Sequence, residues 1–309
     1  MLNEDAGIDD IIRQLTRMEQ ERIWPNGIRY LWTDAFGVVL LCSLYQETGQ
    51  DQWLGKAKWM VSEVEDVLGR DPGFRIGGEP DRHGQHFHYL GMWMYAMYVL
   101  GIWEPEYRQQ AVRLAREIHP YFIRPGHGVY WKMQEDLSGP EPGFGFGALD
   151  HFQGYVIYTL LAPRVLSRER QQMQTLIEKT YKSLQIDQDL GLGIMLWLTH
   201  FLQDDRWAKT QQKRSLKMLR NLWVNPPGYF CRSPGQTDAC FAFTNYGVAL
   251  GLQSTKGTDS RIEKMHRYFA GAGTPDEYAD SAITYVMDCV SHFPGLFLKD
   301  SLEAAEIQG

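Results

Sequence analysis

The sequence lacks the features that mark several classes of protein. Its 309 residues include only four cysteines, and no two of them form a C-x-x-C pair or have zinc-finger spacing. These cysteines are Cys42, Cys231, Cys240 and Cys289. There is no N-x-S/T glycosylation sequon, and the acidic first residues, MLNEDAGIDD, do not resemble a signal peptide. We therefore expect free thiols, a reducing compartment and a cytoplasmic location.

Charge and hydropathy argue against further classes. The net charge is −7, which does not favour nucleic acid or an anionic membrane as the main partner. The longest uncharged apolar run, residues 89–103, is shorter than the ~20 residues of a typical membrane span. The sequence has no Walker A and no G-x-S-x-G motif, and no strand pattern precedes the GLG of residues 191–193. We expect no cofactor.

Helical periodicity is abundant instead, in two kinds of segment that alternate along the chain. One kind is amphipathic and charged, with apolar residues at three- and four-residue steps: 52–68, 106–118, 169–184 and 206–222. The other kind carries almost no charge: 36–45, 89–103, 152–162, 192–202 and 246–253. Further helical segments are 8–21 and two near 260–270 and 278–293, and the best short strand candidate is 128–133. The total is about twelve helices.

This alternation predicts an all-α fold, an (α/α)6 toroid formed as a single domain by residues 1–309. A helix that is apolar on all sides must be surrounded by protein, so the uncharged segments would form the inner ring and the amphipathic ones the outer ring. An open solenoid of helix pairs would show the same alternation. The lack of a polar capping repeat at either end favours the closed form.

A glycine recurs in the first turns of five inner helices. These glycines are Gly37, Gly91, Gly154, Gly193 and Gly247. Glycine costs roughly 1 kcal/mol relative to alanine inside a helix, so its recurrence needs a reason. We interpret it as close packing around a central axis, where a side chain would not fit.

The connections between helices differ in length according to their direction. Those from an inner to the next outer helix are short, whereas those from an outer to the next inner helix are long: 22–30, 70–84, 124–147 and 225–239. All long loops therefore fall at one end, beside the start of the inner helices. Long loops on a rigid scaffold commonly carry function, so this end is the predicted mouth of a site.

Polar and aromatic residues gather at the same end. The candidate catalytic residues are Asp34, His88, Asp150, His151 and Asp238. The candidate substrate-binding residues are Trp32, Arg75, Gln85, His86, Tyr130, Trp131, Phe144, Gln153, Asn245 and Asp280. Asp34, His88, His151 and Thr244 each stand three residues before a repeated glycine, so we expect them to point into one shared cavity. Carboxylates, imidazoles, amides and aromatic rings together suit a sugar or another polyhydroxylated ligand.

Two simpler interpretations compete with a catalytic site. An aspartate at a helix start often caps the helix or compensates its dipole, and a single histidine is often a hydrogen-bonded core residue. The histidines could also bind a metal with Asp150. However, His86 and His88 are two residues apart and would diverge on a helix, so we do not expect a metal.

Two short motifs resemble the six-hairpin glycosidase superfamily. The turn and outer-helix signature of that superfamily, T-G-D-x-x-Y-L-x-x-A, is similar to LYQETGQDQWLGKA (44–57). A weaker similarity to the same signature occurs in FLQDDRWAKT (201–210). LWTDAFG (31–37) also fits the start of an inner helix there. The resemblance implies a carbohydrate-active enzyme, and the fold hosts glycoside hydrolases, unsaturated glucuronyl hydrolases, epimerases and polysaccharide lyases.

Within this range the sequence favours a glycoside hydrolase acting on a small-molecule or oligosaccharide substrate. Asp150 is the first candidate for the acid or base, since the apolar neighbours Leu149 and Phe152 favour a protonated carboxyl, and Asp34 or Asp238 would be its partner. No glutamate stands at the start of an inner helix, which departs from many glycosidases of this fold.

Several alternatives remain open at this point. An epimerase or lyase could use His88 and His151 for proton transfer. A terpenoid cyclase would share the aromatic-lined helical cavity, but no D-x-D-D or D-D-x-x-D/E motif is present. A non-catalytic scaffold that binds a peptide or a glycan is a third class. The sequence does not choose the substrate, the stereochemical outcome or the oligomeric state.

Overall fold

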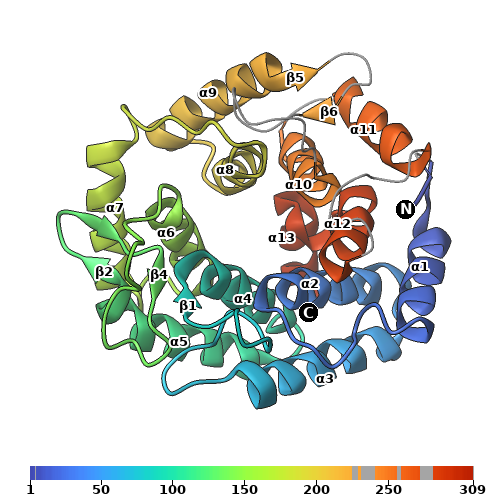
Figure 1. Ribbon diagram of the computed structural model, residues 1–309, viewed down its shortest axis with the longest axis horizontal. Coiled ribbons are helices and arrows are strands. Elements are labelled where there is room, and N and C mark those ends of the chain that lie inside the picture. Colours follow the sequence, from blue (N-terminus) through green and yellow to red (C-terminus); the bar gives the residue numbers. More distant parts are fainter. Residues whose placement is uncertain (4, 225–228, 231–240, 256–258, 272–280, 309) are drawn as a thin grey trace. The chain divides into compact units, whose positions relative to one another are not determined.

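The computed structural model describes residues 1–309 except 4, 225–228, 231–240, 256–258, 272–280 and 309. The described residues form thirteen α-helices, one 3-10 helix and six two-residue strands, which confirms the all-α prediction (Figure 1). Within the described ranges, no helix is both long enough and apolar enough to cross a membrane. Cys42 and Cys289 are buried free thiols, whereas Cys231 and Cys240 lie outside the described residues.

The chain divides into two compact units. The first unit comprises residues 1–26 and 184–301, and the second comprises residues 27–183 and 302–309. The helices of the first unit are α1 (Ile8–Gln20), α8 (Asp189–Phe201), α9 (Arg206–Leu222), α10 (Ala242–Gln253), α11 (Ser260–Gly271) and α12 (Ala282–His292), with the 3-10 helix Gly295–Phe297. Strands β5 (Trp223–Val224) and β6 (Tyr229–Phe230) pair within it.

The second unit contains three helical hairpins. Its helices are α2 (Leu31–Thr48), α3 (Asp51–Leu68), α4 (Phe87–Leu100), α5 (Pro105–Phe122), α6 (Asp150–Leu161) and α7 (Ser167–Thr180). Its strands are β1 (Gln85–His86), β2 (Ile123–Arg124), β3 (Gly128–Val129) and β4 (Lys132–Met133). The uncharged helices α2, α4 and α6 pack against each other in sequence, and each also packs against the amphipathic helix that follows it (Figure 1).

The division into apolar and amphipathic helices follows from the side chains. Residues 90–100 of α4 are buried without exception, and none of them is charged. In α5 a buried stripe including Ala111, Leu114 and Ile118 faces the protein, while the rest of the helix carries the charge. The same contrast separates α8 from α9 in the first unit. The periodicity of the sequence therefore predicted correctly which helices are enclosed by protein.

The repeated glycines mark close approaches between neighbouring helices. A Cβ atom on Gly193 of α8 would lie 2.4 Å from the carbonyl oxygen of Gly247 on α10. A Cβ atom on Gly91 of α4 would lie 2.8 Å from the amide nitrogen of Gln153 on α6. Close packing is confirmed at these two positions, and the atoms in contact belong to the adjacent helix. At Gly193 they are backbone atoms, so glycine lets two helix backbones approach more closely than any side chain allows, whereas at Gly91 they are side-chain atoms of Gln153.

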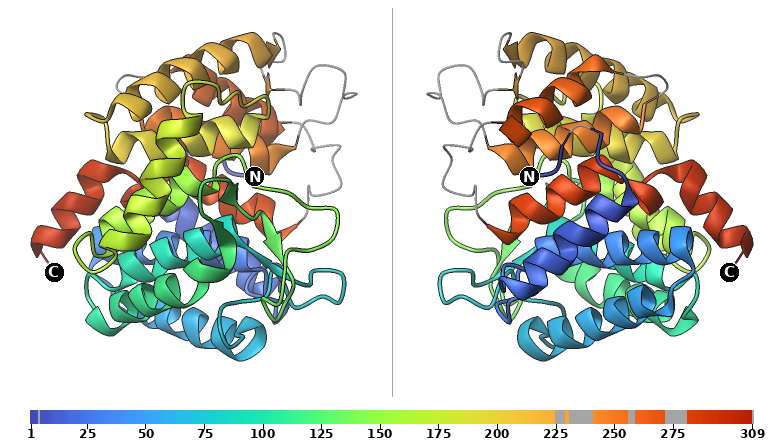
Figure 2. Two further views of the ribbon diagram at one scale, coloured as in Figure 1. Left: turned by 90° about the vertical axis from the view of Figure 1, so that its left-hand side faces the viewer. Right: turned by 90° about the vertical axis from the view of Figure 1, so that its right-hand side faces the viewer.

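The long connections of the second unit lie at one end of its helices. Residues 69–86 and 123–149, which lead into α4 and α6, are on the same side in Figure 2, as their lengths predicted. Strand β1 pairs antiparallel with β4, and β2 pairs antiparallel with β3. The segment expected to form one strand, 128–133, thus forms two short strands with different partners. The β1–β4 pair ties the two long loops together.

The last helix, α13 (Lys299–Gln308), is absent from the periodicity-based prediction. Only Leu302 and Ala305 are buried in it, so its apolar stripe is too short to be recognised in the sequence. In the second unit, the Tyr98 hydroxyl donates a hydrogen bond to Oε1 of Glu306 at 2.7 Å. Arg108 lies 3.7 Å from the same carboxylate.

Candidate functional site

Two histidines meet where the chain passes from strand β1 into helix α4. His86 has an extended backbone (φ −104°, ψ 130°), and it pairs with Lys132 of β4. His88 stands one residue inside the helix. Their ring centroids are 5.2 Å apart, with the rings nearly perpendicular. The expectation that the two side chains diverge is wrong, because it placed both residues on a helix whereas only His88 is helical.

Aromatic side chains surround both histidines. The His86 ring stacks on Tyr89 at 5.1 Å and meets the edge of Trp131 at 4.7 Å. His88 contacts Tyr89 at 4.5 Å, and it lies near Trp32 at 5.9 Å and parallel to Trp131 at 6.0 Å. The hydroxyl of Tyr89 is also hydrogen-bonded to that of Tyr30. The site is therefore polar at the imidazole nitrogens and apolar around them.

The imidazoles combine buried nitrogen atoms with free hydrogen-bonding capacity. Burial lowers the pKa of His86 to about 2, and the neighbouring His88 and Lys132 lower it further. His86 is therefore neutral near neutral pH. The Nδ1 atoms of His86 and His88 are buried, and neither has a hydrogen-bond partner among the described residues. Unpartnered polar atoms in a buried position are costly unless a ligand or water satisfies them.

Asp150 completes this cluster from the start of α6. It is the first residue of the helix and only 3% exposed. Its Oδ1 atom lies 3.8 Å from Nδ1 of His88 and has no hydrogen-bond partner in the described part of the chain. A Cβ atom on Gly147 would lie 1.7 Å from Oδ2 of Asp150, so only glycine at position 147 leaves room for this carboxylate. At 3.8 Å the two atoms are too far apart to form a hydrogen bond with each other.

Asp34 occupies a different environment at the start of α2. Its Oδ1 atom lies 3.6 Å from Nη1 of Arg29, and both side chains are almost fully buried. Its Oδ2 atom accepts a hydrogen bond from the backbone N–H of Tyr30 at 3.2 Å. This predicted catalytic residue thus takes part in an internal ion pair. It contributes to the site through Tyr30, whose hydroxyl holds Tyr89 against the histidines.

His151 lies next to Asp150 in sequence but not in the cluster. Its Nε2 atom is 2.7 Å from the hydroxyl oxygen of Thr180 on α7, so the ring is directed towards the outer helix. Burial lowers the pKa of His151 to about 4. Although His88 and His151 hold equivalent positions before a repeated glycine, their rings face different neighbours. Equivalent sequence positions therefore do not give one shared direction here.

Several predicted binding residues brace the loops around the cluster. The Gln85 amide donates to the carbonyl oxygens of Pro72 and Glu135 and accepts from the N–H of Phe74. Arg75 donates to the carbonyl oxygens of Glu79 and Pro80. Gln153 donates to the carbonyl oxygen of His88 at 3.0 Å and so holds the start of α4 against α6. These contacts position the histidines.

The loop of residues 123–149 contributes the remaining predicted aromatics. Trp131 contacts His86, and Phe144 packs against Trp131 with a centroid distance of 5.2 Å. Tyr130 pairs with Phe146 instead, at 4.9 Å. Trp131 and Phe144 are therefore continuous with the cluster, whereas Tyr130 belongs to a second aromatic pair.

The first unit contains a polar pair of its own. Asp189, the first residue of α8, accepts a hydrogen bond from the Thr244 hydroxyl at 2.6 Å and another from the N–H of Leu190. Asn245 donates to the carbonyl oxygen of Phe241. The predicted residues Asp238 and Asp280 lie outside the described residues.

Sequence reasoning did not select Tyr30, Tyr89 or Lys132. An available signal was the position of Tyr89 beside the histidines in the run HFHY, and of Lys132 beside Trp131. In the described ranges there is no group of three or more His, Cys, Asp or Glu side chains arranged to hold a metal ion.

Comparison with known proteins establishes the fold. No protein-family model matches the sequence, and no match to a curated protein is found. A solved D-mannose isomerase is similar in structure, with a TM-score of 0.66 and 11% identity over 95% of this chain and 89% of that one. Cellobiose 2-epimerase from Spirochaeta thermophila gives a TM-score of 0.60 with 13% identity, covering 86% of both chains.

A hydrolase is among the similar structures as well. The α-1,6-mannanase GH76A from Salegentibacter sp. HEL1_6 gives a TM-score of 0.59 with 10% identity over 92% of this chain and 97% of that one. At such low identity the likeness concerns the fold alone. The chain shares the (α/α)6 fold of these solved structures, so the fold class predicted from the sequence is confirmed.

Proposed function

We propose that this protein is a carbohydrate-active enzyme in which Asp150 and His88 transfer protons, and that its reaction is the hydrolysis of a glycosidic bond. The observation that carries the proposal is the approach of Asp150 Oδ1 to His88 Nδ1 at 3.8 Å, with neither atom hydrogen-bonded to the described protein. Buried, unsatisfied acid and base groups beside aromatic rings are typical of a catalytic site.

Hydrolysis needs one group that gives a proton to the glycosidic oxygen and another that takes a proton from water. Asp150 would exchange the proton with the glycosidic oxygen, since its Oδ1 atom is buried at the start of α6 without a hydrogen-bond partner among the described residues. His88 lies 3.8 Å from this atom, closer than two groups that act on opposite sides of a glycosidic bond, so it would pass a proton to or from Asp150, and a third group would take the proton from water. Trp32 and Trp131 both lie within 6.0 Å of the His88 ring, and Trp131, which is 37% exposed, would present aromatic surface to the C–H bonds of a sugar. The names of the similar structures, which include a mannanase and sugar epimerases, support a sugar as the substrate.

A second candidate is isomerisation or epimerisation of a free sugar. The observation in its favour is the pair of imidazoles, His86 and His88, whose Nδ1 atoms are both unpartnered. The His88 imidazole could remove a proton from the carbon next to a sugar carbonyl and return it, whereas His86, with its pKa lowered to about 2, would hydrogen-bond to the substrate and not act as the base. The similarity to proteins named D-mannose isomerase and cellobiose 2-epimerase is in keeping with this chemistry.

Activity on a panel of oligosaccharides and free aldoses tests the proposal. Release of new reducing ends identifies hydrolysis, whereas incorporation of deuterium from ²H₂O into the sugar C–H positions, followed by NMR, identifies isomerisation or epimerisation. Asp150→Asn and His88→Gln should each lower kcat about 10²–10⁴-fold. The matched control is His127→Gln, an exposed histidine whose Nδ1 atom lies 3.0 Å from the carbonyl oxygen of Pro125. Unchanged turnover in both site variants would refute the proposal.

A further inference from the structure

A tight turn in the loop before α6 presents an aromatic ring beside the candidate site. In the segment 141–144 the N–H of Phe144 donates to the carbonyl oxygen of Glu141 at 3.1 Å. Pro142 and Gly143 stand at the two central positions, and Gly143 has φ +86°. Proline followed by a glycine of positive φ is typical of a type II turn. The turn therefore sets the point at which the Phe144 side chain leaves the backbone.

Phe144 continues the row of rings that begins at the histidines. His86 contacts Trp131 at 4.7 Å, and Trp131 contacts Phe144 at 5.2 Å. Unlike the enclosed Trp32, both Trp131 and Phe144 are about two-fifths exposed, at 37% and 39%. Exposed aromatic rings that extend a buried polar site offer flat surfaces to a ligand larger than the buried part can hold.

Charged groups border this pair of rings. The Nζ atom of Lys132 lies over the Phe144 ring, 5.2 Å from its centroid. Glu141 belongs to the same turn, and its carboxylate lies 3.5 Å from Nε2 of His83. Ammonium, carboxylate and imidazole groups can donate to or accept from hydroxyl groups. Flat rings with a polar border match a pyranose, which has C–H bonds on its faces and hydroxyl groups at its edge.

We propose that Trp131 and Phe144 form a subsite for a second sugar unit, adjacent to the unit held at His88 and Asp150, so that the substrate is a disaccharide or a longer chain. This inference rests on the proposed function, because it assumes a sugar at the first position. The Phe144 ring follows the Trp131 ring in this row, so a single sugar at His88 would not need to cover Phe144. Phe144 is therefore a binding residue that determines chain-length preference.

Binding as a function of chain length tests the subsite. Gluco- and manno-oligosaccharides of one to four units are titrated calorimetrically into the Asp150→Asn protein, in which turnover is expected to be slow. Affinity should rise between one and two units. Phe144→Ala should weaken binding of two or more units about tenfold, the scale of one lost stacking contact, and leave binding of the monosaccharide unchanged. Phe144→Trp should preserve the rise in affinity between one and two sugar units, because tryptophan also has a flat ring.

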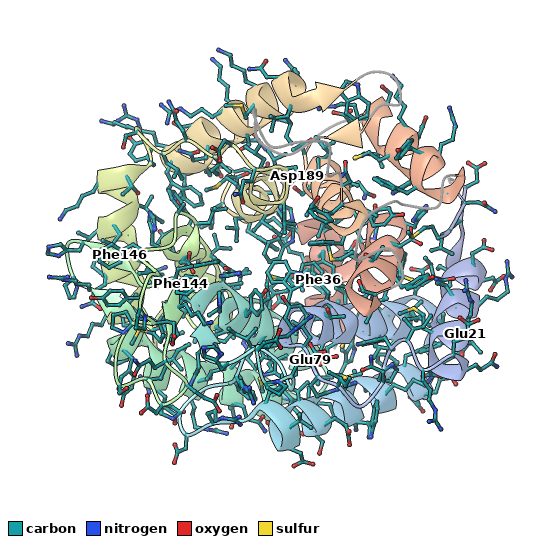
Figure 3. All side chains as sticks on the ribbon, viewed as in Figure 1. Glu21, Phe36, Glu79, Phe144, Phe146 and Asp189 are labelled. Atoms are coloured by element: carbon teal, nitrogen blue, oxygen red, sulfur yellow. The ribbon has the colours of Figure 1, made fainter. Side chains whose placement is uncertain are left out.

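Phe146→Ala is the matched control. Phe146 lies in the same loop and is similarly exposed, at 43%, but its ring pairs with Tyr130. In Figure 3 Phe144 lies on the side of α4, and Phe146 lies further out towards α7. In Phe146→Ala the affinity should still rise between one and two sugar units. Equal weakening for one and two units in Phe144→Ala, or no gain with length in the parent protein, overturns the subsite alone. If no sugar of any length binds, the proposed function fails as well.

Discussion

Asp150 of the second unit and Asp189 of the first unit hold the same position in their helices and behave differently. Each is the first residue of an uncharged helix, and each is 3% exposed. Asp189, labelled in Figure 3, has hydrogen bonds to both carboxylate oxygens, from Thr244 and from the N–H of Leu190. Asp150 has an unpartnered oxygen 3.8 Å from His88.

This comparison separates two uses of an acidic helix start. A carboxylate whose hydrogen bonds are satisfied within the protein stabilises the helix start and the neighbour that donates to it. A carboxylate left unsatisfied next to an imidazole adds little to stability, but it is available to a substrate. We therefore expect Asp150 to affect activity and Asp189 to affect stability. The predictions below test that division, from the largest expected effect to the smallest.

The strongest test exchanges oxygen for nitrogen at Asp150. Asp150→Asn should lower kcat by about 10²–10⁴-fold because the side chain can no longer give or take a proton. The free energy of unfolding should change by less than about 0.5 kcal/mol, since the altered atom has no partner to lose. Steady-state kinetics and urea unfolding measure the two effects. If Asp150→Asn instead lowered the free energy of unfolding as much as the loss of a helix cap and left turnover unchanged, Asp150 would have a structural role and not a catalytic one.

Helix contacts provide the next test. Gly193→Ala should destabilise the protein by about 1–3 kcal/mol, because the new methyl group would meet the backbone of α10. Gly91→Ala should cost less, because the atoms that the new methyl group would meet belong to the Gln153 side chain rather than to a helix backbone, and alanine favours the helix by roughly 1 kcal/mol. Thermal and urea unfolding compare the two variants. Equal losses would mean that the identity of the contacting atom does not matter.

Removal of the Asp189 carboxylate should cost stability and spare activity. Asp189→Ala should lower the free energy of unfolding by about 1–2 kcal/mol, through loss of the hydrogen bonds from Thr244 and Leu190. Thr244→Val removes the other side of the same contact. A double-mutant cycle should show coupling between the two substitutions. A fall in kcat as large as that of Asp150→Asn would place Asp189 in the active site.

Acid sensitivity should follow from buried histidines in both units. Burial lowers the pKa of His151 and of His200 to about 4, against 6.5 when unfolded. Between these values the unfolded state binds more protons than the folded state. Stability should therefore fall as pH falls from about 6.5 to 4, by about 1 kcal/mol per pH unit for each histidine. Urea unfolding across this range measures the slope.

His151→Gln isolates one of these contributions. Glutamine has no titrating group here, so the pH dependence should lose the equivalent of one proton while the hydrogen bond to Thr180 can be kept. His127→Gln, on the exposed loop, should leave the slope unchanged. An unaltered slope in His151→Gln would show that this histidine already binds its proton near pH 6.5 in the folded protein.

The sequence predicted the fold because the fold is encoded in periodicity. The uncharged run in α4 predicts a helix enclosed by protein, and the amphipathic run in α5 predicts a helix with one buried side. Neither prediction needs information from a distant residue. The lengths of the connections likewise predicted that residues 69–86 and 123–149 lie at the same end of the helices of the second unit. The helix α13 was missed because only two of its residues are buried, too few for a periodic signal.

The roles of the polar residues depended on the tertiary structure. Asp34, Asp150 and Asp189 look alike in sequence, since each is an acidic residue in the first turn of an uncharged helix. Their partners differ: Arg29 for Asp34, Thr244 for Asp189, and the approach of His88 for Asp150. No local pattern reveals which side chain from elsewhere in the chain will satisfy a given carboxylate.

The sequence by itself determined which helices are enclosed and where the long loops lie, because burial and loop length are properties of each segment alone. The tertiary structure decided which acidic helix start stays unsatisfied and how two histidines meet. His86 and His88 converge because a strand paired with β4 ends between them and a helix begins. Hydrogen bonding is a pairwise property, so the roles of Asp150 and Asp189 emerged only when their partners were in place.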